Sequence, residues 1–291
     1  MAWKAVDSIE EAAKETRELL LPLNIGLWAK LTFLTLLTGS GLNTAFLQTS
    51  FAPNTGMHHN AIYSSPTQFS NVLIAVTALI LSLGLLFTFL NSIAEFAFFK
   101  TLLTKKAKLW NYFTENTVRG LRYMAYRIFV LITAIIISAS SIVIFSINPF
   151  LGLLALLFFI PLFLALTVLD TLIRDFVLLE MLEKEQKLID SIKSVYRKFR
   201  PQWREVTVYL VVRLVLTTAI AVAIATLAGF TALMFALPAV MLIMLTELSL
   251  IFVLPLIVLS FLFLTLIVVL SMPFNVFLYR YKIEMYQTLQ N

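Results

Sequence analysis

The stretch from Ile128 to Leu169, IFVLITAIIISASSIVIFSINPFLGLLALLFFIPLFLALTVL, contains no charged residue. It is too long for a single crossing, because a helix of about 20 residues already spans the hydrocarbon core of a bilayer. Asn148-Pro149 falls near its middle, and this dipeptide is typical of a turn. The stretch therefore predicts two membrane-spanning helices joined by a tight turn, at about 123–147 and 150–179.

The composition of the whole chain agrees with this local prediction. Of the 291 residues, 60% are hydrophobic and only 13% are charged, whereas a soluble domain carries roughly 25% charged residues. These values exclude an ordinary soluble protein and predict an all-α, polytopic membrane protein with about six transmembrane helices. The predicted spans of its single transmembrane domain, residues 23–279, are 23–47, 71–99, 123–147, 150–179, 205–228 and 251–277.

Amphipathic helices are expected at the membrane surface beside these spans. Residues 1–22 predict a cytoplasmic amphipathic helix, and apolar residues recur at helical spacing between Glu180 and Arg204. Both segments mix charged and apolar residues, as interfacial helices do. The last residues, 280–291, predict a cytoplasmic tail.

The region after Gly229 is the hardest to divide, because it is almost wholly apolar up to Phe277. We predict an outer or re-entrant helix at about 230–248 followed by the sixth span; two full spans, seven in all, are the alternative. No Lys or Arg falls in the predicted outer loops, so the positive-inside rule places both termini in the cytoplasm and requires an even number of spans. Seven spans would place Arg280 and Lys282 outside.

Two parts of the sequence resemble each other. The acid-Phe pairs Glu95-Phe96 and Asp175-Phe176 each end a predicted span and precede a basic amphipathic connection. A Tyr-x-x-x-Arg motif, at 123–127 and at 209–213, then opens the next span. We interpret this as an internal two-fold parallel repeat, of the kind found in transporters. Chance similarity of short apolar motifs is the alternative.

Ionisable residues near the ends of the predicted spans are the candidate functional residues, because charge at membrane depth needs a partner or water. Asp170 and Arg174 are four residues apart on one helix and can pair directly. The repeat further predicts that an acid of one span pairs with an arginine of a neighbouring span, twice. We interpret such pairs as pins between helices; a proton or ion path is the alternative. The candidate inter-helix ion-pair residues are Glu95, Arg127, Asp170, Arg174, Asp175 and Arg213.

Motifs for catalysis or cofactor binding are missing from the sequence. It contains no cysteine, no glycine-rich phosphate loop and no paired-carboxylate or nucleophile signature. His58-His59 is the one metal-ligand pair, and two adjacent histidines point apart on most backbones. We therefore predict no catalytic, cofactor or metal residues and no enzyme activity.

The predicted partners follow from the charge distribution. The basic connections favour anionic lipid head groups at the inner face, although the same charge also serves topology. A homo-oligomer or a membrane-complex partner is expected as well. We predict no nucleic-acid partner despite a pI of about 9.5, because the basic residues flank membrane spans.

Several segments resemble an archaeal family of multi-pass membrane proteins of unknown function. They are the opening MAWKAVDS, TRELLLPLNIGLWAKL at 16–31, the two acid-Phe pairs, Pro201-Gln202-Trp203, and the closing Pro273-Phe274 with Tyr279-Arg280-Tyr281. The architecture is also similar to the membrane domain of bacterial glycerophosphodiester phosphodiesterases. The resemblance implies a cell-membrane location and no established activity or site residues.

The functional expectation is a non-enzymatic membrane scaffold or accessory subunit that acts through lipids or protein partners. A small transporter or channel with a cavity between the repeats is the alternative. An accessory role predicts bound partners or lipids and no continuous polar cavity, whereas a transporter predicts a hydrated cavity at the midplane.

Overall fold

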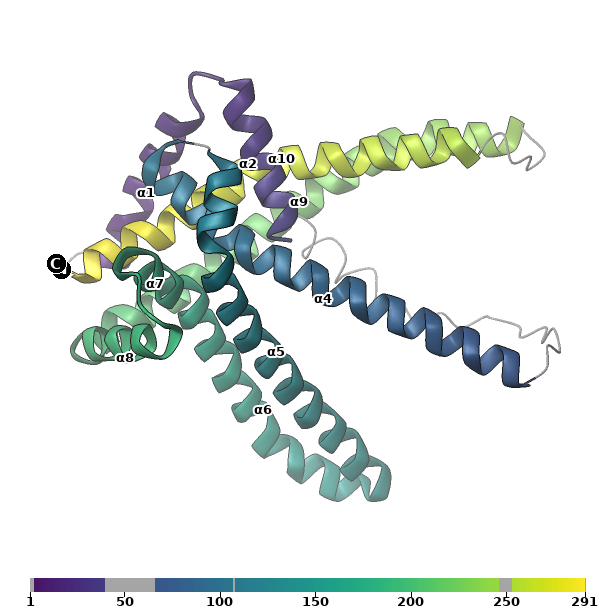
Figure 1. Cartoon of the computed structure of the whole chain (residues 1–291), viewed down its shortest axis with the longest axis horizontal. Helices are drawn as coiled ribbons and strands as arrows, with labels where there is room; N and C mark the ends of the chain where they lie inside the picture. The colour runs from purple at the N-terminus through teal and green to yellow at the C-terminus, as the bar shows by residue number, and fades with distance from the viewer. Residues whose placement is uncertain (1–2, 40–65, 107, 246–252, 291) are drawn as a thin grey trace. The chain divides into compact units, whose positions relative to one another are not determined.

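The computed structural model describes residues 3–39, 66–106, 108–245 and 253–290, and nearly all of these residues are helical (Figure 1). No strand occurs within those ranges, so the predicted all-α fold is confirmed. The α-helices are α1 (Lys4–Leu20), α2 (Ile25–Leu37), α4 (Pro66–Thr104), α5 (Leu109–Ile147), α6 (Pro149–Leu172), α7 (Leu178–Lys184), α8 (Leu188–Phe199), α9 (Trp203–Leu245) and α10 (Val253–Gln290). A π-helix, Ile173–Val177, joins α6 to α7, and a 3₁₀ turn, Arg200–Gln202, joins α8 to α9.

Five helical segments are long and apolar enough to cross a membrane. They correspond to the second to sixth predicted spans and are Thr77–Thr104, Leu109–Ile147, Pro149–Lys184, Leu188–Phe235 and Val258–Gln290. The first predicted span, 23–47, is described only in part. Its α2 has 13 apolar-rich residues, or about 20 Å of helix, and residues 40–47 lie outside the described ranges.

Several helices are much longer than the thickness of a bilayer. The 43 residues of α9 make a helix of about 64 Å, against about 30 Å of hydrocarbon. The structure differs here from the prediction of a fifth span at 205–228 and a separate helix at 230–248, because α9 continues past residue 228 without a break as far as Leu245. Gly229 costs a helix only about 1 kcal/mol, whereas unpaired backbone groups in lipid cost several, so the helix does not end there.

The turn between α5 and α6 has the local structure that its sequence predicts. The Asn148 side-chain oxygen caps α6 by accepting a hydrogen bond from the backbone N–H of Phe150 at 2.9 Å, and Pro149 occupies the first helical turn. Gly152 allows the two helices to approach closely, because a Cβ atom there would lie 2.7 Å from the Cα of Phe145. The resulting hairpin runs α5 and α6 side by side (Figure 1).

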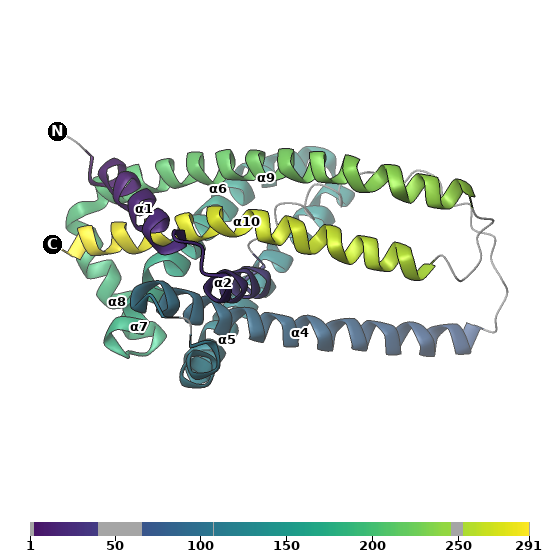
Figure 2. The same cartoon turned by 90° about the horizontal axis from the view of Figure 1, so that it is seen from above.

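The chain divides into two compact units. The first comprises residues 1–12, 92–209 and 280–291, and the second comprises 13–91 and 210–279. In the first unit the opening turns of α1 and the closing turns of α10 lie next to each other (Figure 2). In the second unit, α2 and part of α10 line an apolar groove of about 840 Å³.

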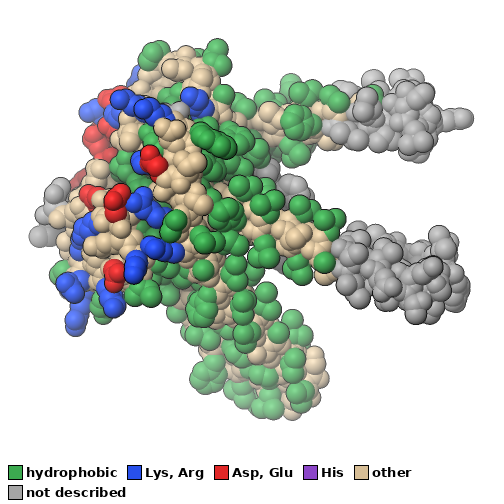
Figure 3. Space-filling view, viewed as in Figure 1, with side chains coloured by type: hydrophobic (Ala, Val, Ile, Leu, Met, Phe, Trp, Pro, Cys, Tyr) green, Lys and Arg blue, Asp and Glu red, His purple; other side chains and the backbone are tan. Residues whose placement is uncertain are grey.

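In the first unit the buried residues surround the charged ends of the helices, and many apolar side chains are exposed, unlike in a soluble protein. The core of this unit contains fully buried aromatic residues such as Phe96, Tyr123 and Tyr209. The outer part of the α5–α6 hairpin instead exposes its apolar side chains, and charged side chains are absent from the face of it that Figure 3 shows. Exposed apolar surface of this extent is typical of contact with lipid or with another protein.

Candidate functional site

The π-helix Ile173–Val177 of the first unit takes part in two ion pairs, each with a fully buried carboxylate. Its wider turn interrupts the regular spacing of α6, and such π-turns occur frequently at functional sites. The neighbouring residues Arg174 and Asp175 bind residues of two different helices. Arg174 Nη2 lies 2.8 Å from Glu95 Oε1 on α4, and Asp175 Oδ1 lies 3.0 Å from Lys282 Nζ on α10.

Glu95 lies in the interior of the first unit beside an aromatic cluster. Its side chain is fully buried, whereas that of Arg174 is 28% exposed, so the arginine connects the buried carboxylate to the surface of the unit. Glu95 is also near enough to the fully buried Tyr123 to act on it electrostatically. The guanidinium of Arg127 lies over the same tyrosine ring, 5.7 Å from its centre.

Asp175 joins three helices through one buried carboxylate. Besides the ion pair with Lys282, its Oδ2 accepts a hydrogen bond of 2.8 Å from the hydroxyl of Tyr209 on α9. The Tyr209 ring stacks on Tyr281 of α10 with ring centres 5.5 Å apart. Asp175 is fully buried and the Lys282 side chain is 8% exposed, so losing either partner would leave an uncompensated charge in the interior.

A third buried carboxylate, Glu180, ties α7 to α8 and α10. Its oxygens lie 2.6 Å from Lys184 Nζ and 2.8 Å from Lys198 Nζ. They also accept hydrogen bonds from the hydroxyls of Ser194, at 2.6 Å, and of Tyr286. Charge-assisted hydrogen bonds of this kind are roughly twice as strong as neutral ones, so this cluster holds the α7–α8 hairpin on the last turns of α10.

Both ends of the chain are fixed within the first unit. The Tyr281 hydroxyl donates a hydrogen bond of 3.1 Å to the carbonyl of Ala5, and Lys4 Nζ donates one of 3.1 Å to the carbonyl of Thr288. Arg280 donates a hydrogen bond of 2.7 Å to the carbonyl of Leu102, near the end of α4. The residues predicted as a tail therefore include the final buried turns of α10.

The structure places five of the six sequence-predicted ionisable residues in the first unit, and it pairs two of their acids with cations of other helices. Glu95 binds Arg174, and the cation bound to Asp175 at 3.0 Å is Lys282 rather than an arginine. Asp170 acts electrostatically on Tyr123 and Tyr126. Arg127 lies over the ring of Tyr123 in the first unit, whereas Arg213 is half-buried in the second unit.

Sequence reasoning missed Lys282, Glu180 and the tyrosines that bind the carboxylates. One signal was available: apolar residues at 283, 286 and 289 follow Lys282 at helical spacing, which indicates a packed helix rather than a tail. Within the described ranges no group of His, Asp or Glu side chains is arranged to hold a metal ion. His58-His59 lies outside those ranges.

Within each of the two predicted repeat motifs, equivalent residues contact each other in the structure, with different ring geometry. Phe96 and Tyr123 of the first motif meet edge to face with ring centres 6.1 Å apart. Phe176 and Tyr209 of the second motif meet at 4.8 Å. In each motif the tyrosine also interacts with the motif's own acid, Glu95 or Asp175.

Comparison with known proteins gives one match. A sequence model described as a family of unknown function, DUF7544, matches residues 3–291. Neither curated proteins nor solved structures give any match.

Proposed function

Because the chain belongs to the DUF7544 family, whose function is unknown, we propose that it is a non-enzymatic membrane scaffold or accessory subunit acting through lipids or protein partners. The observation that carries this proposal is the ion-paired core of the first unit. Its buried carboxylates are bound by cations from other helices, and the apolar helices that extend from this core expose their faces. Such a core fixes the helices and leaves their faces for partners.

Both termini lie on the cytoplasmic side in this proposal. The contacts of Ala5 with Tyr281 and of Lys4 with Thr288 support a common side for the two ends, and the concentration of Lys and Arg near them supports the cytoplasmic side. A common side requires an even number of crossings. Five helices are long enough, so a sixth crossing is assigned to the segment that begins with α2.

The internal repeat is also part of the proposal. It is supported by the equivalent contacts of Phe96 with Tyr123 and of Phe176 with Tyr209. In each motif the phenylalanine of the acid-Phe pair packs on the tyrosine of a following helix. The repeat thus produces two similar helix joints at the charged end of the unit, which suits a structural role.

The apolar faces of α5 and α6 indicate where partners bind. Phe129 is 65% exposed and Phe158 is 78% exposed, and both lie on the hairpin that extends from the core. In a bilayer these side chains contact lipid, a second copy of the chain or another membrane protein. A scaffold needs such surface, whereas an enzyme would need a convergent set of catalytic groups.

A transporter remains the second candidate because of the π-helix. It carries Arg174, which binds the fully buried Glu95, and it carries Asp175, which is itself fully buried. Buried acids are typical of proton paths. The second oxygen of Glu95, Oε2, is buried and accepts no hydrogen bond from the described part of the chain.

Proteoliposome flux measurements distinguish the two candidates. The purified protein is reconstituted into vesicles loaded with a pH-sensitive dye, and proton flux is measured under an imposed potential with empty vesicles as the control. The scaffold proposal predicts the same flux with and without the protein. Flux that requires the protein and disappears in Glu95→Gln would replace the scaffold with a transporter.

Purification from native membranes tests the positive part of the proposal. The tagged protein is cross-linked in its own membrane and its mass is measured in a mild detergent. A scaffold or accessory subunit is expected in a complex of defined stoichiometry, with itself or with another membrane protein. A monomer under all cross-linking conditions would contradict this role.

A further inference from the structure

The outward face of α8 presents cations that no acid in the described part of the chain neutralises. Lys193, Arg197 and Arg200 are exposed, and none of them forms an ion pair with a residue in the described ranges. Lys198 on the same helix differs, because it binds the buried Glu180 at 2.8 Å. Among the cations of α8 and of the turn after it, Lys198 therefore stabilises the core, whereas Lys193, Arg197 and Arg200 are available to a ligand.

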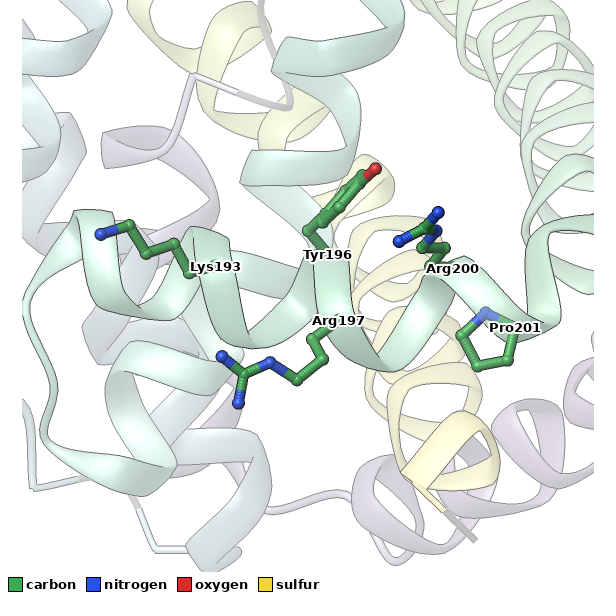
Figure 4. A pocket seen from close by; sticks show the side chains of 5 residues that line it. All are labelled: Lys193, Tyr196, Arg197, Arg200 and Pro201. Atoms are coloured by element: carbon green, nitrogen blue, oxygen red, sulfur yellow. The ribbon is translucent and has the colours of Figure 1, made fainter.

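The opposite face of α8 fixes the direction in which these cations point. Ser191, Val195 and Phe199 are buried, and the Phe199 ring meets Phe176 of the π-helix edge to face at 4.7 Å. With that face anchored, the basic face cannot rotate into the core. It lines a pocket of about 590 Å³ together with Tyr196 and Pro201 (Figure 4).

The dimensions of the site indicate a ligand larger than a single phosphate. Lys193 and Arg200 are separated by seven residues of α8 and the following turn, or about 10 Å along the helix axis. Figure 4 shows the three cations spread along the helix, with Tyr196 between Lys193 and Arg200. A head group with two phosphates can contact the cations at both ends with each phosphate on a different side chain.

Exposed apolar and aromatic residues beside the cations favour a lipid over a soluble anion. Ile189 is 66% exposed, Tyr196 67% and Trp203 62%. Trp203 is the first residue of α9, which continues into a segment long and apolar enough to cross the membrane. A site at the start of such a segment, with tryptophan and tyrosine beside cations, has the composition of the head-group region.

We propose that Lys193, Arg197 and Arg200, with Tyr196, form a binding site for a phospholipid head group that carries two phosphates. The inference rests on the proposed membrane-scaffold function and names the lipid partner and its site. The guanidinium groups bind the phosphates through paired N–H donors, the lysine binds as a point charge, and the Tyr196 ring covers the glycerol part. The acyl chains extend into the bilayer beside α9.

Lipid binding by the purified full-length protein tests this site. Fluorescent cardiolipin, which carries two phosphates, is titrated in detergent against the protein, with labelled phosphatidylglycerol and phosphatidylcholine for comparison. The order expected is cardiolipin, then phosphatidylglycerol, then phosphatidylcholine. The variant Lys193→Gln/Arg197→Gln/Arg200→Gln should bind cardiolipin about 100-fold more weakly, since each basic residue contributes about fivefold.

The matched control removes the same charge from the other basic connection. Lys105→Gln/Lys106→Gln/Lys108→Gln alters exposed lysines between α4 and α5 and should retain nearly full cardiolipin affinity. Unchanged melting temperatures of both variants show that each is folded. If both variants lose the same cardiolipin affinity, binding depends only on the net positive charge of the protein, and the proposed site is wrong. Equal affinity for phosphatidylcholine and cardiolipin would also overturn the site.

Competition by pyrophosphate separates a lipid from a soluble ligand. Pyrophosphate carries the two phosphate groups without acyl chains, so it should displace cardiolipin only weakly. Displacement at concentrations comparable with those of the lipid would overturn the lipid assignment in favour of a soluble diphosphate. The scaffold function is tested separately by flux and cross-linking, so loss of the lipid site alone would leave it standing.

Discussion

Replacing Asp175 with Asn removes the charge that Lys282 binds in the interior of the first unit. Both side chains are almost completely buried, and their charged atoms lie 3.0 Å apart. Breaking a buried ion pair by removing one partner costs about 3 to 5 kcal/mol, mainly because the other charge stays buried without compensation. The hydroxyl of Tyr209 still has the amide oxygen of the new side chain as its acceptor, so this hydrogen bond does not add to the cost.

A double-mutant cycle isolates the ion pair from the other contacts of the two residues. Asp175→Asn and Lys282→Gln are each expected to lower the apparent melting temperature in detergent by roughly 6 to 20 °C, at 2 to 4 °C per kcal/mol. Asp175→Asn/Lys282→Gln should melt higher than either single variant, because no buried charge remains uncompensated. The coupling between the two positions is expected to be at least about 2 kcal/mol.

The control for this cycle is an exposed acid of the same unit. Glu185, whose side chain is 79% exposed, lies 2.9 Å from Arg119, and Glu185→Gln should change the free energy of unfolding by less than about 1 kcal/mol. If Asp175→Asn melts within about 2 °C of the wild-type protein, or if the two single losses simply add, the buried pair does not hold these helices together.

Two further predictions concern the α5–α6 hairpin and the Glu180 cluster. Gly152→Ala should lower the melting temperature by several degrees, because the added Cβ would lie 2.7 Å from the Cα of Phe145. The control is Gly84→Ala on α4, where nothing lies within 4 Å of the added Cβ; its melting temperature should be unchanged or higher. Glu180→Gln should loosen the α7–α8 hairpin, because Lys184 and Lys198 would lose the carboxylate that binds them. Limited proteolysis should then cleave the hairpin faster than in the wild-type protein, and an unchanged cleavage rate would contradict the role of the cluster.

The parts of the fold that follow from local sequence could be predicted. The uncharged run with Asn148-Pro149 at its middle specifies the α5–α6 hairpin, because apolar length and turn chemistry are both local properties. The position at which α9 ends was not predictable from Gly229. In a helix whose surroundings exclude water, one glycine is too weak a signal to overcome the cost of unpaired backbone groups.

The candidate site could be predicted only in outline. The sequence indicates that Glu95 and Asp175 need partners, because buried carboxylates without partners are rare. It does not indicate that the partner of Asp175 is Lys282, which comes from the last helix, since pairing across the whole chain depends on how the helices pack. The π-turn that directs Arg174 and Asp175 to different helices likewise has no sequence signature.

Topology tests the central claim, a membrane protein whose charged core and both termini lie on the cytoplasmic side. The chain has no cysteine, so single cysteines at Glu10, Ile147 and Gln287 can be labelled in intact cells with a maleimide that does not cross membranes. We expect the maleimide to label Ile147→Cys, in the α5–α6 turn, in intact cells, and to label Glu10→Cys and Gln287→Cys only after the cells are opened. Labelling of Glu10→Cys and Gln287→Cys on opposite sides of the membrane would contradict a common side for the two termini.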